Sequence, residues 1–255
     1  MAAHGAHRRA RAPHRTPVRR RAQRWRARPA VVVASAGVPV TVREASGSAE
    51  TRAAAAVRAA SFYTYPTDRS EFTVDSHRKM KLNAEWEAIE RKVAGEETGY
   101  EGVRVLCLVA AAGLEAVGEE KAEGLDGSCR LPARAGSERE VVLGTLDVNV
   151  GRKLPAEELV GTKGSRKAAV ERAYLSNVCT GPSARRMGIA ASLVREAKAV
   201  AAAEGVKHLY VHCVHDNGAA EALYRSHGFE VEAEESTAEA HELGRPRRLL
   251  LYCAL

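Results

Sequence analysis

Along the first half of the chain, the spacing of apolar residues is typical first of a strand and then of two helices. The alternation of apolar and polar residues at 38–43 (VPVTVR) predicts a strand. An Ala-rich stretch at 53–62 then predicts a helix, and a second helix is predicted between Pro66 and Gly95, where the glycine would stop it. The apolar residues of this second helix recur every three or four positions: Leu82, Trp86, Ile89 and Val93.

Two long apolar runs, at 103–111 and 141–150, predict the next strands. The segment between them, 112–140, is rich in glycine and charged residues, so we interpret it as a long, mobile insertion in a hairpin. A second insertion is predicted near 151–168, where Pro155 and basic clusters interrupt the pattern. Either insertion could form part of a substrate lid, and the sequence does not decide this.

From residue 173 onward, strands and helices alternate closely. We predict strands at 173–180, 208–214, 229–235 and 247–255, and helices at 188–204 and 217–226. This order predicts an α/β fold with a central sheet, which begins at residue 38 and continues to residue 255.

Composition places the chain among globular proteins, with 45% apolar and 28% charged residues over 255 positions. The net charge of +7 would suggest a nucleic-acid binder if it were spread evenly. However, residues 1–43 contain eleven Arg and no Lys, Asp or Glu. Residues 44–255 contain the remaining 28 Lys and Arg together with 32 Asp and Glu, so their net charge is −4. We therefore expect no nucleic-acid partner for the folded domain.

Residues 1–37 have the Arg-rich, acid-free composition of an organelle transit peptide. Val32-Val33-Ala34 resembles the processing site of green-algal plastid transit peptides, which favours the plastid stroma over the mitochondrion. The alternative is a disordered basic arm that contacts RNA or an acidic partner. The apolar stretch at 30–42 is too short to cross a bilayer, and we expect no membrane partner.

The five cysteines lack the spacing of a zinc site or a disulfide framework, so we expect buried thiols in a reducing compartment and no metal. They are Cys107, Cys129, Cys179, Cys213 and Cys253.

The segment 178–190 (VCTGPSARRMGIA) places the end of a strand, a turn and the start of a helix in succession. Backbone N–H groups at a helix N-terminus attract a pyrophosphate, and Arg185 and Arg186 add positive charge. Gly188 would let the backbone approach the ligand closely, and Ala190 keeps the next position small. The segment fits neither the G-x-G-x-x-G nor the G-x-x-x-x-G-K-[ST] pattern, so it does not favour NAD or ATP as the ligand.

Two motifs at the expected separation resemble the GNAT superfamily of N-acetyltransferases. The first is Arg185-x-x-Gly188-x-Ala190, and the second is Asn217-x-x-Ala220-x-x-Leu223-Tyr224, closed by Gly228-Phe229. The phrase RAASF at 58–62 and the run SNVCT…ARRMGIA also resemble the plastid acetyltransferases of plants and green algae. The resemblance implies a mixed central sheet flanked by helices, with the strands at 173–180 and 208–214 splayed to form a slot for acetyl-CoA.

It also implies direct acetyl transfer to an amine in a ternary complex. The expected acceptor is a protein lysine or N-terminus; a small arylalkylamine, or a non-catalytic role in binding acetyl-CoA, is the alternative. Residues expected to bind the cofactor are Val178, Cys179, Thr180, Arg185, Arg186, Met187, Gly188, Ile189, Ala190, Ala191, Asn217 and Tyr224.

Tyr224 is the expected catalytic residue, because a tyrosine hydroxyl can protonate the departing CoA sulfur. The general base is open between Glu171, His212, His215 and an ordered water. Asn217 could also cap its helix, while Leu223 and Phe229 are expected to pack, and Cys179 is read as a core thiol rather than a nucleophile.

Overall fold

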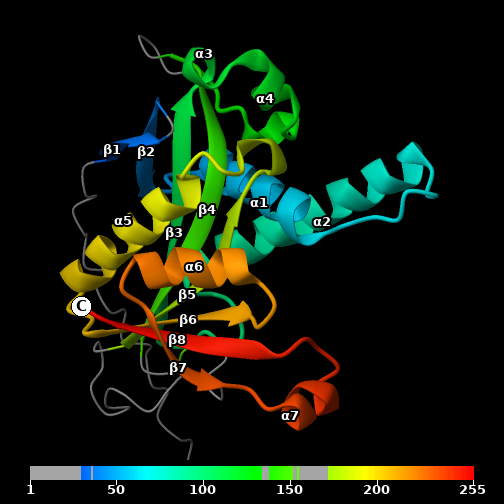
Figure 1. Ribbon diagram of the computed structural model, residues 1–255. Coiled ribbons are helices and arrows are strands. Elements are labelled where there is room, and N and C mark those ends of the chain that lie inside the picture. Colours follow the sequence, from blue (N-terminus) through cyan, green and yellow to red (C-terminus); the bar gives the residue numbers. More distant parts are fainter. Residues whose placement is uncertain (1–29, 36, 134–137, 152–153, 155–171) are drawn as a thin grey trace, which may run out of the picture.

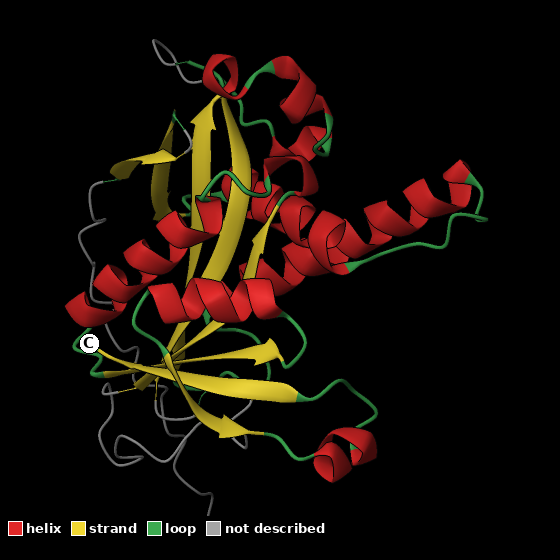
Figure 2. Ribbon diagram, in the orientation of Figure 1, coloured by secondary structure: helices red, strands yellow, loops and turns green. Residues whose placement is uncertain are grey.

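The computed structural model describes residues 30–35, 37–133, 138–151, 154 and 172–255. In this part of the chain, one eight-stranded sheet has the order β1-β2-β3-β4-β5-β6-β8-β7 (Figures 1 and 2). The strands are β1 Val31–Ser35, β2 Val38–Glu44, β3 Val103–Gly113, β4 Glu140–Gly151, β5 Arg172–Thr180, β6 His208–Val214, β7 Glu230–Glu234 and β8 Arg248–Ala254. The helices are α1 Ser48–Phe62, α2 Glu71–Ala94, α3 Leu114–Val117, α4 Glu119–Glu123, α5 Ile189–Ala203, α6 Gly218–Ser226 and α7 Thr237–Glu242. The mixed α/β class is thereby confirmed.

Neighbouring strands are antiparallel except β5 and β6, which run parallel. The sheet twists strongly, so that β3 and β4 stand upright in Figure 1 while β6 and β8 run across it. The one parallel pair therefore lies where the two halves of the sheet meet.

Helices cover both faces of the sheet. On one face, a Cβ at Gly144 of β4 would lie 2.7 Å from Ile189 Cγ2, so the glycine lets α5 pack unusually close to the strand. On the other face, Arg58 of α1 reaches Asp147, also on β4. Figure 1 shows α5 and α6 in front of the sheet with α1 and α2 behind it, and the N-terminal half of α2 projects from the body.

The second predicted helix ends as expected. Gly95 has a φ of 73° and its N–H bonds to the Lys92 carbonyl, which closes α2. Val93, however, is 43% exposed, so the buried face of α2 extends only to Ile89.

The segment between β3 and β4, expected to be a long, mobile insertion, contains short helices that the sequence did not predict. Its described part folds into α3, α4 and a 3₁₀ turn, Gly127–Cys129. Apolar side chains from this part join the main core: Leu114, Val117, Ala122, Leu125, Cys129 and Leu131. Each of these helices spans less than two turns, which is too short to show a period in the sequence. The second insertion, near 151–168, lies outside the described residues except at Gly151 and Leu154.

Two other elements were not predicted. β1 pairs with β2, although its residues were assigned to the transit peptide. α7 lies between β7 and β8, and a capping box of Ser236 and Glu239 begins it. The five cysteines are all buried, free thiols, as predicted. Among the described residues, no helix is long and apolar enough to cross a membrane.

Candidate active site

The parallel strands β5 and β6 separate halfway along their length. Their pairing runs from Arg172 and His208 to Leu175 and Val211 and stops there. Beyond this point β5 continues to Thr180 along β4, while β6 continues to Val214 along β8. The edges that face each other there carry backbone groups able to pair with an extended ligand. This split is the slot expected from the sequence.

The N-terminus of α5 follows β5 directly. Gly188, with a φ of 77°, precedes the first turn, and the structure records no side chain capping it. Arg185 and Arg186 are exposed just before it, whereas Met187 and Ile189 are buried and fix the turn to the core. Ala190 and Ala191 are half-buried. Uncapped N–H groups beside two guanidinium groups suit a pyrophosphate, so the residues present fit the expected cofactor.

The three candidates on β5 differ in their environment. Val178 and Thr180 are half-buried, and Cys179 between them is buried. Burial raises the pKa of the Cys179 thiol to about 12, so it stays protonated and is a poor nucleophile at neutral pH. The Thr180 carbonyl accepts a hydrogen bond of 2.9 Å from Ser61 Oγ at the end of α1.

α6 carries the second motif. Asn217 caps it, because its side-chain oxygen accepts a hydrogen bond of 3.1 Å from the Ala220 N–H, and the residue is exposed. Gly228, at a φ of 81°, follows the last turn, and Phe229 is buried. Leu223 packs against the core. The capping role expected of Asn217 and the packing expected of Leu223 and Phe229 are confirmed.

Tyr224 lies in α6 and is 4% exposed. Burial raises the pKa of its hydroxyl, and electrostatic interactions with Cys213, Tyr174 and Cys179 raise it further. These groups belong to β5 and β6, the two strands beside the split. A phenol that stays protonated in this place can act as a general acid.

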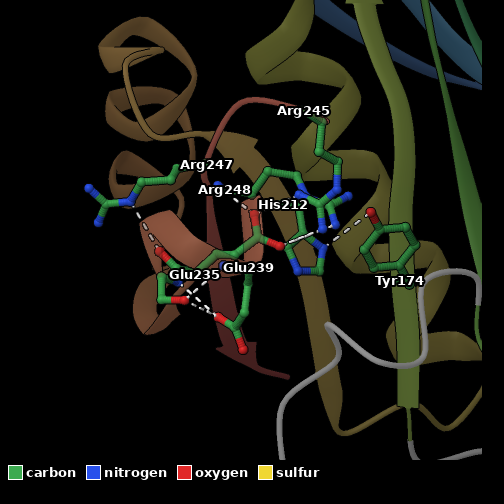
Figure 3. A network of polar contacts seen from close by, with 8 residues as sticks. Tyr174, His212, Glu235, Glu239, Arg245, Arg247 and Arg248 are labelled. Carbon is green, nitrogen blue, oxygen red and sulfur yellow. Dashed lines mark hydrogen bonds and ion pairs between the residues drawn. The ribbon is translucent and has the colours of Figure 1, made fainter. Parts of the chain in front are cut away.

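The candidate bases lie in different surroundings. His212 follows Val211, the last residue of β6 that pairs with β5, and its Nδ1 lies 3.3 Å from the Tyr174 hydroxyl (Figure 3). His215 is at the end of β6 between two carboxylates, 3.0 Å from Asp216 and 2.9 Å from Glu234. Glu171 lies outside the described residues.

The connection from β7 to β8 is held by a charged cluster beside His212 (Figure 3). Arg245 Nη1 donates to Glu235 Oε2 over 2.6 Å, and this contact lowers the pKa of Glu235. Arg247 Nε donates to the Glu235 carbonyl over 3.0 Å. These bonds fix the course of the chain around α7.

Four residues near the split were given no functional role from the sequence: Arg58, Ser61, Asp147 and Asn177. Arg58 and Ser61 lie in the RAASF phrase, which was noted only as a resemblance. Charged residues inside apolar segments, such as Asp147 in β4, are rarely buried unless they are paired, and that signal was available.

Residues 132–229 match the model of the Acetyltransferase (GNAT) family. Over 215 residues the chain is 36% identical to GCN5-related N-acetyltransferase 7, chloroplastic, of Arabidopsis thaliana, covering 84% of this chain and 76% of that protein. It is 31% identical to GCN5-related N-acetyltransferase 6, chloroplastic, of the same plant, covering 74% of this chain and 61% of that protein. Among solved structures, the PaiA N-acetyltransferase of Thermoplasma acidophilum, in complex with coenzyme A, matches with a TM-score of 0.47 and 15% identity, covering 85% of this chain and 99% of that one. The residues of the family match contain the split, α5 and Tyr224.

Proposed function

Because the chain belongs to the GNAT family of acetyl-CoA-dependent N-acetyltransferases, we propose that it acetylates protein amines, either lysine side chains or N-terminal α-amines, in the plastid stroma. The chemistry is supported most directly by one observation: β5 and β6 stop pairing at Leu175 and Val211, and the uncapped N-terminus of α5 follows β5. The protein acceptor is supported by the likeness of the RAASF phrase and the SNVCT…ARRMGIA run to plastid acetyltransferases. The plastid is supported by the two relatives, which are both named chloroplastic.

Residues at two elements, the N-terminus of α5 and the strand β5, would share the binding of the cofactor. Exposed Arg185 and Arg186, with the N–H groups at the start of α5, would hold the pyrophosphate. The backbone of Val178 and Thr180 would pair with the pantetheine arm as a neighbouring strand does. Acetyl-CoA, when bound, supplies the acetyl group as a thioester.

Tyr224 then has one task, which is to hold a proton for the sulfur that leaves when the amine takes the acetyl group. Its raised pKa keeps the hydroxyl protonated at neutral and mildly alkaline pH. Direct attack by the amine needs no enzyme nucleophile, in agreement with the protonated state of Cys179.

The proton of the attacking amine needs an acceptor. Of the described candidates, His212 is favoured over His215, because it follows the last paired residue of β6, whereas His215 is already engaged by two carboxylates. A water held near His212 could serve the same purpose.

The test is a comparison of the lysine and N-terminal acetylomes of plastids with and without this protein. Loss of a defined set of acetylated sites, reproduced by purified enzyme on matching peptides, supports the proposal. If purified enzyme acetylates arylalkylamines but no peptide, the acceptor is a small amine. If it binds acetyl-CoA tightly and acetylates neither, the protein acts as a binding module.

A further inference from the structure

A buried ion pair links α1 to the sheet beside the split. Arg58 of α1 donates from Nη2 to Asp147 Oδ1 on β4 over 2.6 Å, and the two side chains are 1% and 2% exposed. Arg58 Nη2 also lies 3.6 Å from Cys107 Sγ. The carboxylate beside it raises the pKa of Arg58 despite burial, so the guanidinium stays charged.

The second oxygen of the carboxylate continues the link to β5. Asp147 Oδ2 accepts a hydrogen bond of 2.8 Å from Asn177 Nδ2. Asn177 has a φ of 55°, in the left-handed region that residues other than glycine seldom adopt. The chain Arg58–Asp147–Asn177 therefore ends on a residue with an unusual backbone conformation.

That conformation marks a bulge in β5. Ser176 pairs with Asp147 and Cys179 pairs with Thr145, so Asn177 and Val178 together face the single residue Leu146. A bulge turns backbone groups away from the regular ladder. This one begins two residues after Leu175, where β5 and β6 cease to pair, so it lies at the closed end of the slot.

Stability alone gives no reason for this arrangement. Replacing a buried ion pair by apolar residues of similar size is often neutral or stabilising. A strained backbone conformation persists only where its surroundings impose it, and such residues concentrate at functional sites. The ion pair and the left-handed asparagine are joined by one hydrogen bond, which favours a single shared role.

We propose that Asp147, with Arg58 as its buried counter-ion, is a positioning residue that acts through Asn177 to fix the bulge at the end of the slot where acetyl transfer takes place. The inference rests on the proposed function, since the pyrophosphate end of the slot is at α5 and the thioester must therefore lie toward the bulge. Ser61, three residues after Arg58 and on the same side of α1, holds the other end of this strand through the Thr180 carbonyl. The RAASF phrase thus contains both Arg58, which bonds to Asp147, and Ser61, which bonds to the Thr180 carbonyl.

The experiment compares two double variants that both remove the ion pair. Arg58→Met with Asp147→Asn keeps an oxygen that can accept from Asn177, whereas Arg58→Met with Asp147→Leu removes it. In the first variant kcat should stay close to wild type. In the second it should fall about tenfold or more, because small misplacements of reacting groups cost this much. Affinity for CoA, measured by calorimetry, should fall much less than kcat, since α5, which would hold the pyrophosphate, is untouched.

Hydrogen exchange gives a readout that does not depend on turnover. Acetyl-CoA should protect the amides of residues 176–180 in the wild type and the Asp147→Asn double variant, and protect them much less in the Asp147→Leu double variant. Equal kcat and equal protection in both would overturn the inference, as would equal loss in both. Wild-type protein that shows this exchange pattern but acetylates no amine would refute the proposed function and leave the positioning role supported.

If the Asp147→Leu double variant fails to fold, Asn177→Gly decides the question. Glycine adopts the left-handed conformation without strain and leaves the ion pair intact, but it has no side chain to anchor. Loss of kcat and of the exchange protection supports the inference, and wild-type behaviour overturns it.

Discussion

The chemistry of the site depends on where single polar side chains are buried. Tyr224 of α6 is buried beside Phe229, with ring centroids 5.7 Å apart, and groups on both strands of the split add to burial in raising the pKa of its hydroxyl. Burial disfavours the phenolate, so the residue is suited to give a proton and unsuited to take one. His212, half-buried and in contact with Tyr174, is better suited to the opposite task.

Tyr224→Phe removes one oxygen and keeps the ring. We expect affinity for acetyl-CoA to change little and kcat to fall at least about tenfold, because general acid catalysis contributes typically 10²–10⁴-fold. An acyl donor with a more acidic thiol should recover part of the rate, since its sulfur needs less protonation as it leaves. The check is steady-state kinetics with two such donors, and an unchanged kcat where chemistry limits turnover would make Tyr224 a packing residue.

The pH profile gives a second test of the same residue. Because burial raises the pKa of Tyr224 above its ordinary value of about 10, the hydroxyl stays protonated to higher pH than a free tyrosine. The alkaline limb of kcat that reports this acid should therefore lie above pH ~10 and be missing in Tyr224→Phe. An alkaline limb in the wild type that persists unchanged in the variant would assign it to another group.

At the scale of elements, the position of α5 determines where the proposed cofactor site lies. Its N-terminus presents Gly188 and the two arginines, and its body lies on β4 where Gly144 leaves no side chain. A displacement of the helix would move the pyrophosphate site relative to the split. The glycine in β4 and the glycine before α5 therefore contribute to one function.

Gly144→Ala should weaken acetyl-CoA binding from a distance. Its Cβ would meet Ile189 Cγ2 at 2.7 Å, Leu193 Cδ1 at 3.0 Å and the Cys179 carbonyl at 3.1 Å, so the helix or the strand must shift. Overpacking of this kind costs about 1–3 kcal/mol of stability. Urea denaturation and calorimetry measure the two effects. Gly127→Ala is the matched control, since a Cβ there meets nothing within 4 Å, and equal behaviour of the two variants would contradict the expectation.

Gly188→Glu should abolish acetyl-CoA binding, because it places bulk and negative charge at the N-terminus of α5. Since Gly188 has a φ of 77°, Gly188→Asn is the control for backbone strain: asparagine tolerates this conformation and adds no charge. It should retain more affinity than the glutamate variant. Calorimetry on folded Gly188→Glu protein with unchanged affinity would refute the cofactor site.

Arg186→Ala should weaken acetyl-CoA binding modestly, and the difference in affinity from the wild type should shrink as the salt concentration is raised.

The elements predicted from the sequence are those in which the hydrophobic pattern continues over several helical turns or several strand residues. β2 to β8 and the helices α2, α5 and α6 agree with the predicted ranges to within a few residues at each end, whereas α1 begins at Ser48, five residues before its predicted start. α3, α4 and α7 are too short to show a helical period, although the capping box of Ser236 could have indicated α7. The candidate phosphate loop and Tyr224 could be proposed from the sequence because their motifs are local. Arg58 and Asp147 are 89 residues apart, and only the register of the folded sheet joins them to Asn177.

At the scale of the whole molecule, the N-terminal segment raises a question of its own. The positive charge of the chain is concentrated in residues 1–43, and residues 44–255 carry a net charge of −4. β1 forms the edge of the sheet beside β2 and contacts α5. Processing at Val32-Val33-Ala34, as we propose for plastid import, would divide this strand and leave β2 as the edge. Removal of the segment would also leave the domain acidic overall.

A reporter fused to residues 1–45 should enter plastids, and the chain without these residues should stay in the cytosol. N-terminal sequencing of the imported protein then locates the cut. A new terminus within 32–38 agrees with the proposed processing site and predicts that β1 is dispensable for folding, which a thermal melt of residues 38–255 can check. A terminus before residue 31 would keep β1 in the mature sheet. Import of the fusion into mitochondria would overturn the plastid assignment and preserve the transit peptide. If the full basic segment is retained on the protein in the cell, the transit interpretation is wrong and the segment should be assayed for binding to RNA.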